Sequence, residues 1–328
     1  MSTPRVLVAG ETLVDLLPER SGPLDRVERF VRRPGGAPAN VAVALARLDE
    51  VPWFWTRLAT DPLGDFLGRT LDAEGIPGRF VERDADARTT LALVTHDEDA
   101  VPTFSFYRAE GPDARFEPGT VPDDALDAVD WVVFGGVVLS TGAGWRALLD
   151  LVRRARERDC TVVFDPNARP ELWDEGEFAR AIDEVLPLVD VVKASPDDLE
   201  LAGFDAGLDP EALARAVCGR GPHTTLLTLG GDGSIAVAAA DAPWGPAERA
   251  HPGYAVDAVD TTGAGDAFLA GTVAALAEGR SLEEVLGFAN AVAARTTTGS
   301  GAMTALPDRG AVEAFRDRVG SKTTEERD

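Results

Sequence analysis

The sequence has few of the residues that build disulfide frameworks and metal sites. Its 328 residues include two cysteines, Cys160 and Cys218, and three histidines that stand far from one another. Two cysteines cannot form a disulfide framework, and scattered histidines exclude a His-rich metal site and disfavour a His-based triad. The longest apolar runs, such as residues 131–138, are about half as long as a bilayer requires, which excludes a membrane span.

Lysine is also scarce, because Lys193 and Lys322 are the only two and arginine carries nearly all of the positive charge. The net charge of −24 disfavours a nucleic-acid-binding role, which needs a phosphate-neutralising surface. Such an acid excess with so little lysine predicts a halophilic protein, because multimolar salt screens self-repulsion. An acidic protein from a GC-rich genome is the alternative, and both concern habitat rather than function.

Alternating strand and helix patterns predict an α/β fold. Short apolar runs alternate with helical patterns, as in βα units around a mostly parallel sheet. Strands are expected at residues 5–9, 131–135, 161–164, 189–193, 224–229 and 254–259. Helical patterns cover residues 144–158 and 210–218, and residues 264–298 predict two helices around a break at 279–281. No basic segment followed by an apolar stretch opens the sequence, which predicts a cytoplasmic protein.

Two segments do not fit the βα scheme. Residues 12–33 and 88–108 each look like a strand pair, with turns near 21–22 and 97–100. Residues 103–107 alternate like a half-buried strand. These strands are predicted to form a small sheet over the main domain, as a lid. We therefore expect one domain over residues 1–320, with this discontinuous lid, and a polar tail at 321–328.

The segment DTTGAGDAFLAGT, at residues 260–272, has the most informative chemistry. Gly263, Ala264 and Gly265 leave the backbone N–H groups of an expected helix N-terminus accessible. Those groups, at the positive end of the helix dipole, suit a transferring phosphate. Asp266 follows at once and can accept a proton from a hydroxyl beside that phosphate. The alternative is a tight turn with an ordinary N-terminal helix charge.

A second glycine-led segment, PGGAPANVAVALARL, covers residues 34–48. Gly35 and Gly36 permit close backbone approach, and Pro38 suits the first turn of a helix. Asn40 in that turn carries an amide that can bond a sugar hydroxyl in both directions. The alternative is a glycine turn before an ordinary core helix.

Phosphate-binding motifs of other classes are missing. The sequence has no G-x-x-x-x-G-K-[ST] loop, no G-x-G-x-x-G after a strand and no H-R-D catalytic loop. The two glycine-led segments, in this order, resemble both signatures of the ribokinase-like (PfkB) carbohydrate kinase family. The resemblance extends from residue 6 to about residue 315. It implies a doubly wound α/β fold, with a mostly parallel sheet flanked by helices and a small β-sheet lid over a sugar.

The resemblance also implies roles for residues near the sugar. Asp266 would be the catalytic base beside an anion hole formed by Gly263, Ala264 and Gly265. Asp15, in GETLVDLLP, falls where many members place a carboxylate that accepts two sugar hydroxyls. The other implied sugar contacts are Gly35, Gly36 and Asn40.

Nucleotide and cation contacts are implied in the same way. The implied ATP contacts are Ser195, Thr228, Gly230, Gly233 and Asn290. From the residues alone, a simple β-turn is the alternative for the TLGGDG segment around Gly230, and Asn290 is a helix-surface amide. Asp260 and Thr262, with the 297–301 loop, correspond to a monovalent-cation site for K⁺, although similar residues also cap helices.

One departure from the family concerns Mg²⁺. Many members carry an Asn-x-x-Glu motif whose Glu helps to hold Mg²⁺ and its waters. Here KASPDD places Ser195 and Asp198 at those positions. The shorter Asp predicts a contact through water. The alternative is a helix start, with a Ser N-cap and Pro at the first position.

The segment DPNARPELW, at residues 165–173, follows a predicted strand at the edge where open α/β sheets bind ligands. It resembles the DPN-x-R…W stretch of fructokinases and 2-keto-3-deoxygluconate kinases. Asn167 and Arg169 would then reach the sugar or the phosphates. A surface turn with a stacked Trp is the alternative.

These features predict a kinase that transfers the γ-phosphate of Mg-ATP to a small ketose. Arg108 and Arg169 are candidate partners for the carboxylate of 2-keto-3-deoxygluconate. Asp15 would repel that acid, and GGAPANVA is closer to the fructokinase branch, so D-fructose is the predicted substrate. Another sugar or nucleoside kinase of the family remains open, as does a sugar-binding regulator without catalysis. A homodimer through the lid is expected.

Overall fold

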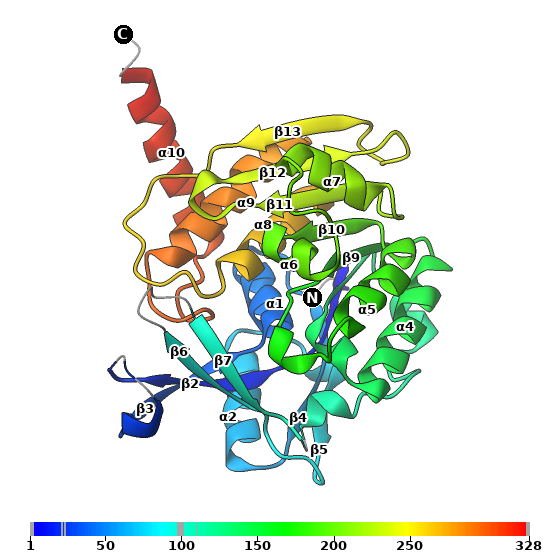
Figure 1. The fold of residues 1–328 in the computed structure, drawn as a ribbon, viewed down its shortest axis with the longest axis vertical. Helices are drawn as coiled ribbons and strands as arrows, with labels where there is room; N and C mark the ends of the chain where they lie inside the picture. Colours follow the sequence, from blue (N-terminus) through cyan, green and yellow to red (C-terminus); the bar gives the residue numbers. More distant parts are fainter. Residues whose placement is uncertain (1–2, 21, 23, 97–101, 110, 326–328) are drawn as a thin grey trace.

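The protein is described by a computed structural model that covers residues 3–20, 22, 24–96, 102–109 and 111–325. A nine-stranded sheet in the order β13-β12-β11-β10-β9-β8-β1-β4-β5 forms its centre (Figure 1). Neighbouring strands pair in parallel, except that β12 pairs antiparallel with both β11 and β13. The strands are β1 (Val6–Ala9), β4 (Trp53–Ala59), β5 (Val81–Asp84), β8 (Trp131–Gly135), β9 (Thr161–Asp165), β10 (Val191–Ala194), β11 (Thr224–Thr228), β12 (Ser234–Ala238) and β13 (Ala247–His251).

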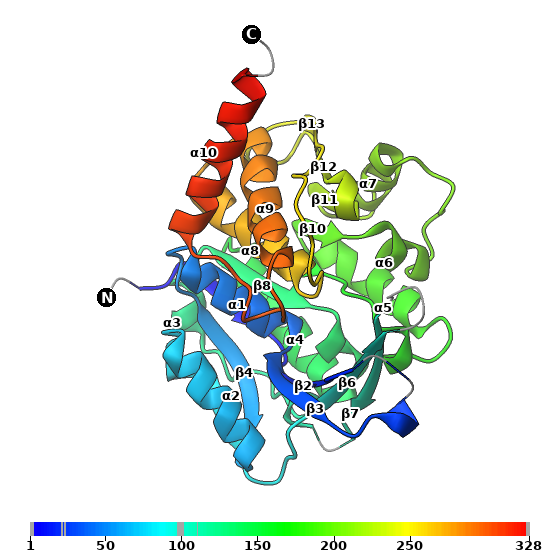
Figure 2. The same ribbon diagram turned by 90° about the vertical axis from the view of Figure 1, so that its left-hand side faces the viewer.

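Both faces of this sheet are buried under helices, as a mostly parallel sheet requires. In β1, Val6 and Val8 pack into one half of the core while Leu7 and Ala9 pack into the other. Figure 2 shows the sheet between two helical layers. One layer contains α1 (Ala37–Arg47), α2 (Pro62–Ala73), α8 (Ala264–Ala277), α9 (Leu282–Thr297) and α10 (Arg309–Glu325). The other contains α4 (Gly142–Arg156), α5 (Glu177–Val185), α6 (Pro196–Leu201) and α7 (Pro210–Cys218), and the short α3 (Asp123–Leu126) precedes β8.

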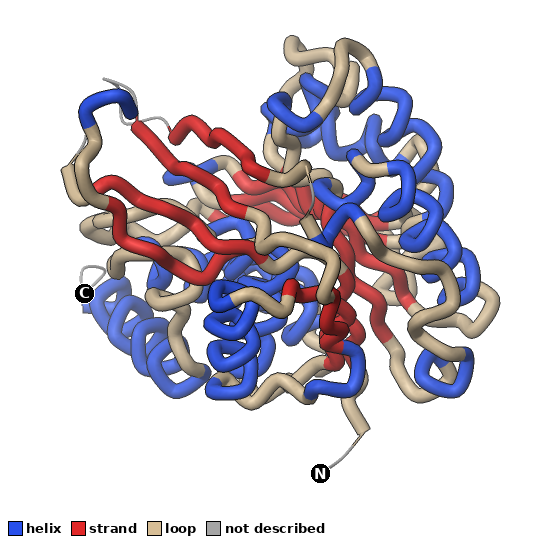
Figure 3. Tube along the Cα trace, turned by 90° about the horizontal axis from the view of Figure 1, so that it is seen from below, coloured by secondary structure: helices blue, strands red, loops and turns tan. Residues whose placement is uncertain are grey.

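A second, smaller sheet has the order β3-β2-β6-β7 (Figure 3). It pairs β2 (Leu13–Pro18) with β3 (Phe30–Gly35), and β6 (Leu91–His96) with β7 (Pro102–Tyr107), both antiparallel. β2 and β6 join the two hairpins in parallel. The predicted fold class, including the small sheet, is confirmed. The turn predicted at 97–100 and Ser21 of the other turn lie outside the described residues.

The structure differs from the predictions at the sheet edge and near the C-terminus. The strand predicted at 254–259 is wrong, because these residues follow β13 without joining a sheet. Pro252, which lacks an N–H group, and Gly253, at φ 75°, end the strand at His251. The sequence predictions also missed β4, β5, β12 and β13. The predicted polar tail is helical as far as Glu325, in α10.

The order of strands around β1 opens the crevice that holds the candidate site. β1 pairs with β4 on one side and with β8 on the other, so the chain reverses direction across the sheet at this strand. In open α/β sheets, such a switch point leaves a ligand-binding crevice outside the carboxyl ends of the strands. The segments after β1, β8 and β9 meet there with the N-termini of α1 and α8.

Candidate active site

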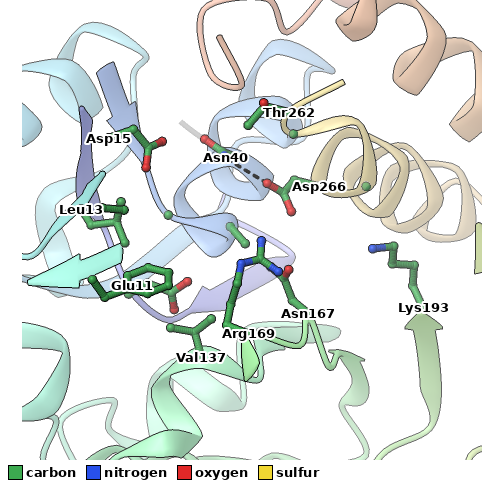
Figure 4. A pocket seen from close by; sticks show the side chains of 16 residues that line it. Glu11, Leu13, Asp15, Asn40, Val137, Asn167, Arg169, Lys193, Thr262 and Asp266 are labelled. Carbon is green, nitrogen blue, oxygen red and sulfur yellow. Dashed lines mark hydrogen bonds between the residues drawn. The ribbon is translucent and has the colours of Figure 1, made fainter. Parts of the chain in front are cut away.

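A cavity of about 160 Å³ occupies this crevice, and it is lined by charged, polar and glycine residues from several elements. We call the side formed by Glu11, Leu13 and Asp15 the acidic end, and the side formed by the α8 N-terminus and Lys193 the cationic end (Figure 4). Asp266 lies between the two ends. Among the residues predicted from sequence, the cavity is lined by Asp15, Gly36, Asn40, Asn167, Arg169, Thr262, Gly263, Gly265 and Asp266.

Helix α8 begins at the cationic end with a turn that suits glycine. Gly263 adopts a φ of 80°, and a Cβ atom there would lie 2.6 Å from the Ala302 Cβ. Among the described residues no side chain caps this helix. Its first N–H groups therefore lack intrahelical partners and carry the positive end of the dipole. A Cβ atom on Gly265 would lie 2.9 Å from Lys193 Nζ, so glycine keeps room for that ammonium group.

Asp266 lies in the first turn of α8, buried, with its carboxylate oriented by α1. Asn40 Nδ2 donates a hydrogen bond of 2.8 Å to Asp266 Oδ2. Burial raises the pKa of Asp266 to about 6, and the Asn40 bond opposes that rise. Asn40 Oδ1 is buried without a hydrogen-bond partner in the described part of the chain. Asn40 thus positions the carboxylate, and its own carbonyl oxygen accepts no hydrogen bond from the described residues.

Lys193, in β10, is a site residue that the sequence predictions missed. Its Nζ lies 2.9 Å from Asp165 Oδ2, and the two side chains are 7% and 5% exposed. Burial lowers the pKa of Lys193, but the negative charges of Asp165, Asp198 and Asp266 outweigh it and raise the pKa overall. The ammonium group therefore stays protonated at the cationic end. Its signal was available, since one of only two lysines stands inside an apolar strand.

At the acidic end, Asp15 extends from β2 into the cavity. A Cβ atom on Gly35, which pairs with Leu13 across the β2–β3 hairpin, would collide with Asp15 Oδ2. Gly35 therefore makes room for the carboxylate rather than lining the cavity itself. Burial raises the pKa of Asp15 to about 7, with Arg169 opposing the rise and Asp266 adding to it.

Glu11 is a second carboxylate at the acidic end, and the sequence predictions also missed it. It follows β1 by two residues and is 2% exposed. Burial raises the pKa of Glu11 to about 7. Its position directly after a buried central strand was the available signal, because ligands bind at that edge.

The predicted arginines lie in different places. Arg169 lines the cavity, together with Asn167, on the loop after β9. Arg108 lies behind the cavity wall, where its guanidinium pairs with Asp113 and donates to Ser140 Oγ and the Val137 carbonyl at 2.6 and 3.1 Å. A substrate contact by Arg108 would require breaking these bonds, so that role remains a prediction.

Ser195 and Asp198 form a capping box at the start of α6. Asp198 Oδ2 accepts from the Ser195 backbone N–H at 2.8 Å and from its hydroxyl at 2.7 Å. Asp198 Oδ1 accepts from the Ala168 N–H at 2.8 Å. The geometry corresponds to the helix-start alternative, and any Mg²⁺ contact of Asp198 must share these occupied oxygens.

The other predicted residues lie outside the cavity lining. Asp260 accepts from the backbone N–H groups of Thr262 and Gly301, both at 2.9 Å, and so ties the predicted cation loop to the α8 turn. Gly230 and Gly233 belong to the turn between β11 and β12, and Thr228 is the last residue of β11 before that turn. Asn290 Nδ2 donates to Ser234 Oγ at 2.6 Å, which anchors α9 to β12. Their nucleotide and cation roles remain predictions.

The described part of the chain contains neither a metal-binding cluster of side chains nor a membrane-spanning helix. Among those residues, no group of three or more His, Cys, Asp or Glu side chains is arranged to hold a metal ion. None of the helices described is both long and apolar enough to cross a membrane.

Comparison with known proteins identifies the class. The pfkB carbohydrate kinase family matches residues 3–309. The fructokinase of Klebsiella pneumoniae is 34% identical over 312 residues, which are 92% of this chain and 96% of that protein. The aminoimidazole riboside kinase of Salmonella typhimurium is 33% identical over 310 residues, 92% of each chain. The chain therefore belongs to the PfkB family of carbohydrate kinases, which are phosphotransferases.

Solved structures agree with this assignment. The fructokinase of Xylella fastidiosa with bound ATP has a TM-score of 0.85 at 29% identity, over 96% of this chain and 98% of that one. The fructokinase of Vibrio cholerae O395 with fructose, ADP and calcium has a TM-score of 0.82 at 30% identity, over 96% and 99%.

Proposed function

We propose that this protein is an ATP-dependent kinase that phosphorylates a small ketose, with D-fructose as the preferred substrate. The observation that carries the proposal is the position of Asp266. Its carboxylate is held by Asn40 at the N-terminus of α8, between an end suited to hydroxyls and an end suited to phosphates.

The arrangement favours in-line transfer of the γ-phosphoryl group. Asp266 accepts the proton of the attacking sugar hydroxyl, whose oxygen bonds to the γ-phosphorus as the bond to the leaving ADP breaks. The N–H groups of Gly263 and Gly265 stabilise the charge on the transferred group, whereas the Ala264 N–H donates to the Thr261 carbonyl at 3.2 Å. Lys193 Nζ adds a positive charge beside Gly265. The products are the sugar phosphate and ADP, and the proton leaves through Asp266.

The chain's residues fit a Mg²⁺ that arrives with the nucleotide. Mg²⁺ usually keeps several waters and binds through substrate phosphates and one or two carboxylates, so a cage of protein ligands is not required. Asp198 would hold it through water, because both of its oxygens already accept hydrogen bonds. Bound Mg²⁺ would neutralise charge on the phosphates.

The acidic end favours a neutral sugar. Two carboxylates, the buried Glu11 and the half-buried Asp15, line the cavity there, and they accept from hydroxyls while repelling an anionic substrate. Arg169 supports the second candidate, 2-keto-3-deoxygluconate, because it is an arginine with access to the cavity. The riboside kinase relative, at nearly the same identity as the fructokinase, supports a riboside as a third candidate.

A sugar panel tests the proposal. Release of ADP from Mg-ATP should be measured with D-fructose, 2-keto-3-deoxygluconate and aminoimidazole riboside, with competition between pairs. We expect the highest kcat/KM for fructose. A clear preference for the acid or the riboside would change the substrate, and no ADP release with any of them would favour the regulator.

The assembly and compartment belong to the same proposal. We infer that the small sheet acts as a lid and pairs between two subunits. Tyr107, on β7, is 64% exposed and Val31, on β3, is 36% exposed, so the sheet offers apolar side chains to a second copy. Sedimentation should give the mass of a dimer, and a monomer would refute it. A cytoplasmic location would supply the ATP.

A further inference from the structure

Glu11 is a buried carboxylate without a hydrogen-bond partner on one of its oxygens. Its Oε2 is enclosed and accepts no hydrogen bond within the described residues, although the side chain is only 2% exposed and lines the cavity. Burial of a charged oxygen without a hydrogen-bond partner raises the free energy of the folded state, because its hydrogen bonds to water are lost and no others replace them. Such an atom in a cavity wall indicates a missing donor.

The charged groups around Glu11 do not supply that donor. The guanidinium of Arg108, its nearest cationic influence, is occupied by Asp113, Ser140 and the Val137 carbonyl. Asp113 and Asp266 are negative and raise the pKa of Glu11 further, beyond the effect of burial. Glu11 therefore brings to the cavity lining an oxygen that no described donor satisfies, and Arg169 and Lys193 are the cationic residues that share this lining.

We propose that Glu11 is a specificity-determining residue, which accepts a hydrogen bond from a hydroxyl of the sugar and disfavours anionic substrates. This inference rests on the proposed function. A neutral sugar brings a donor that satisfies Oε2. A carboxylate substrate bound at the same end would face Glu11 and Asp15 together.

The test is Glu11→Gln, with Glu313→Gln as the matched control. Glu313 lies exposed in α10, away from the cavity. Calorimetric titration of fructose and of 2-keto-3-deoxygluconate measures binding without requiring phosphoryl transfer. We expect the fructose Kd to rise about tenfold in Glu11→Gln. The acid's Kd should rise less or fall, and ATP binding should stay within twofold of the wild type. The control should match the wild type throughout.

Thermal unfolding tests the raised pKa of Glu11 separately from sugar binding. The folded-state pKa of about 7 exceeds the ordinary 4.5, so the stability that Glu11 contributes is full below pH 4.5 and lost as pH rises through 7. Replacing it with Gln removes that loss. The melting temperature of Glu11→Gln should therefore increase relative to the wild type as pH goes from 5 to 8.

The outcomes are distinguishable. An unchanged fructose Kd, or equal losses for both sugars, overturns the role of Glu11 even if the wild type phosphorylates fructose. Wild-type binding of fructose without ADP release refutes the kinase proposal while Glu11→Gln still tests the inference. Wild-type protein that binds neither sugar overturns both. A second variant, Glu11→Asp, retains the charge and should keep the selectivity for fructose over the acid.

Discussion

The two ends of the cavity carry opposite charges, and different kinds of chemical groups supply these charges. The acidic end uses side-chain carboxylates, Glu11 and Asp15, whose pKa values burial raises to about 7. The cationic end uses backbone N–H groups at a helix N-terminus and Lys193, whose charge is held in place by Asp165. Hydroxyl donors suit the first end, and phosphate oxygens suit the second.

The acidic end and the cationic end of the cavity also belong to different parts of the fold. Lys193 lies in β10, which pairs with its neighbours in the main sheet, and α8 is one of the helices that cover this sheet. Asp15 belongs to the small sheet, and the Glu11 carboxylate lacks a partner on one oxygen. We therefore expect substitutions at the cationic end to lower turnover and substitutions at the acidic end to change substrate affinity. The predictions below test this division, in order of expected effect.

Asp266→Asn should have the largest effect, because this residue joins the two ends. Loss of a general base costs about two to four orders of magnitude in kcat, while binding of ATP and sugar should survive. Steady-state kinetics and titration calorimetry measure the two separately. A variant with near-normal turnover would remove Asp266 from the role.

Lys193→Met should lower kcat by about two to three orders of magnitude, the range seen when one stabilising donor is lost. The fructose Kd should change little, because Lys193 lies away from the acidic end. Lys322→Met, which replaces the other lysine, is the matched control. A variant that loses fructose affinity but keeps kcat would contradict the division between the ends.

Asp15→Ala should raise the fructose KM at least about tenfold, since it leaves sugar hydroxyls without an acceptor. kcat at saturating fructose should fall much less than in Asp266→Asn. Initial rates across fructose concentrations decide this, and an unchanged KM would remove Asp15 from sugar binding.

The pH dependence of kcat/KM should fall on the acid side. Protonation of Asp266, with a pKa of about 6, removes the base, and protonation of Glu11 and Asp15 near pH 7 removes acceptors. Both effects lower the rate as pH falls, so kcat/KM at pH 5 should be at least about tenfold below its value at pH 8. A profile that stays flat down to pH 5 would refute the raised values.

Salt should affect stability without distinguishing the ends. If the −24 charge is a halophilic adaptation, the melting temperature should rise steeply between low and molar KCl, because salt screens surface repulsion. Differential scanning calorimetry measures it. A flat profile would leave only the GC-rich genome to explain the composition.

Local chemistry made much of the fold and the cationic end predictable. Pro38 and the apolar residues after it predicted α1, and the small residues at 263–265 predicted the open start of α8. Both signals depend on residues that are close in sequence. The β12–β13 edge was missed because SIAVA is short and AERAH carries charges, so neither shows a strong strand pattern.

The arrangement of the acidic end was not predictable, because it depends on contacts between segments that are distant in sequence. Glu11 Oε2 accepts no hydrogen bond from the described residues, and Arg108 pairs with Asp113, but sequence spacing does not show where a guanidinium points. The same pairing explains why Arg108, predicted to reach the substrate, lies behind the wall. Asn40 was predicted to bond only sugar, yet its amide also orients Asp266 across the chain.

The hydrogen bond between Asn40 and Asp266 joins residues 226 positions apart. At about 5–20 residues per second, a ribosome makes α8 roughly 10–45 s after α1. Throughout that interval the apolar face of α1, including Val41 and Leu45, has no α8 to cover it. Nascent chains that end before α8 therefore carry the apolar face of α1 without its covering helix and lack the carboxylate of Asp266.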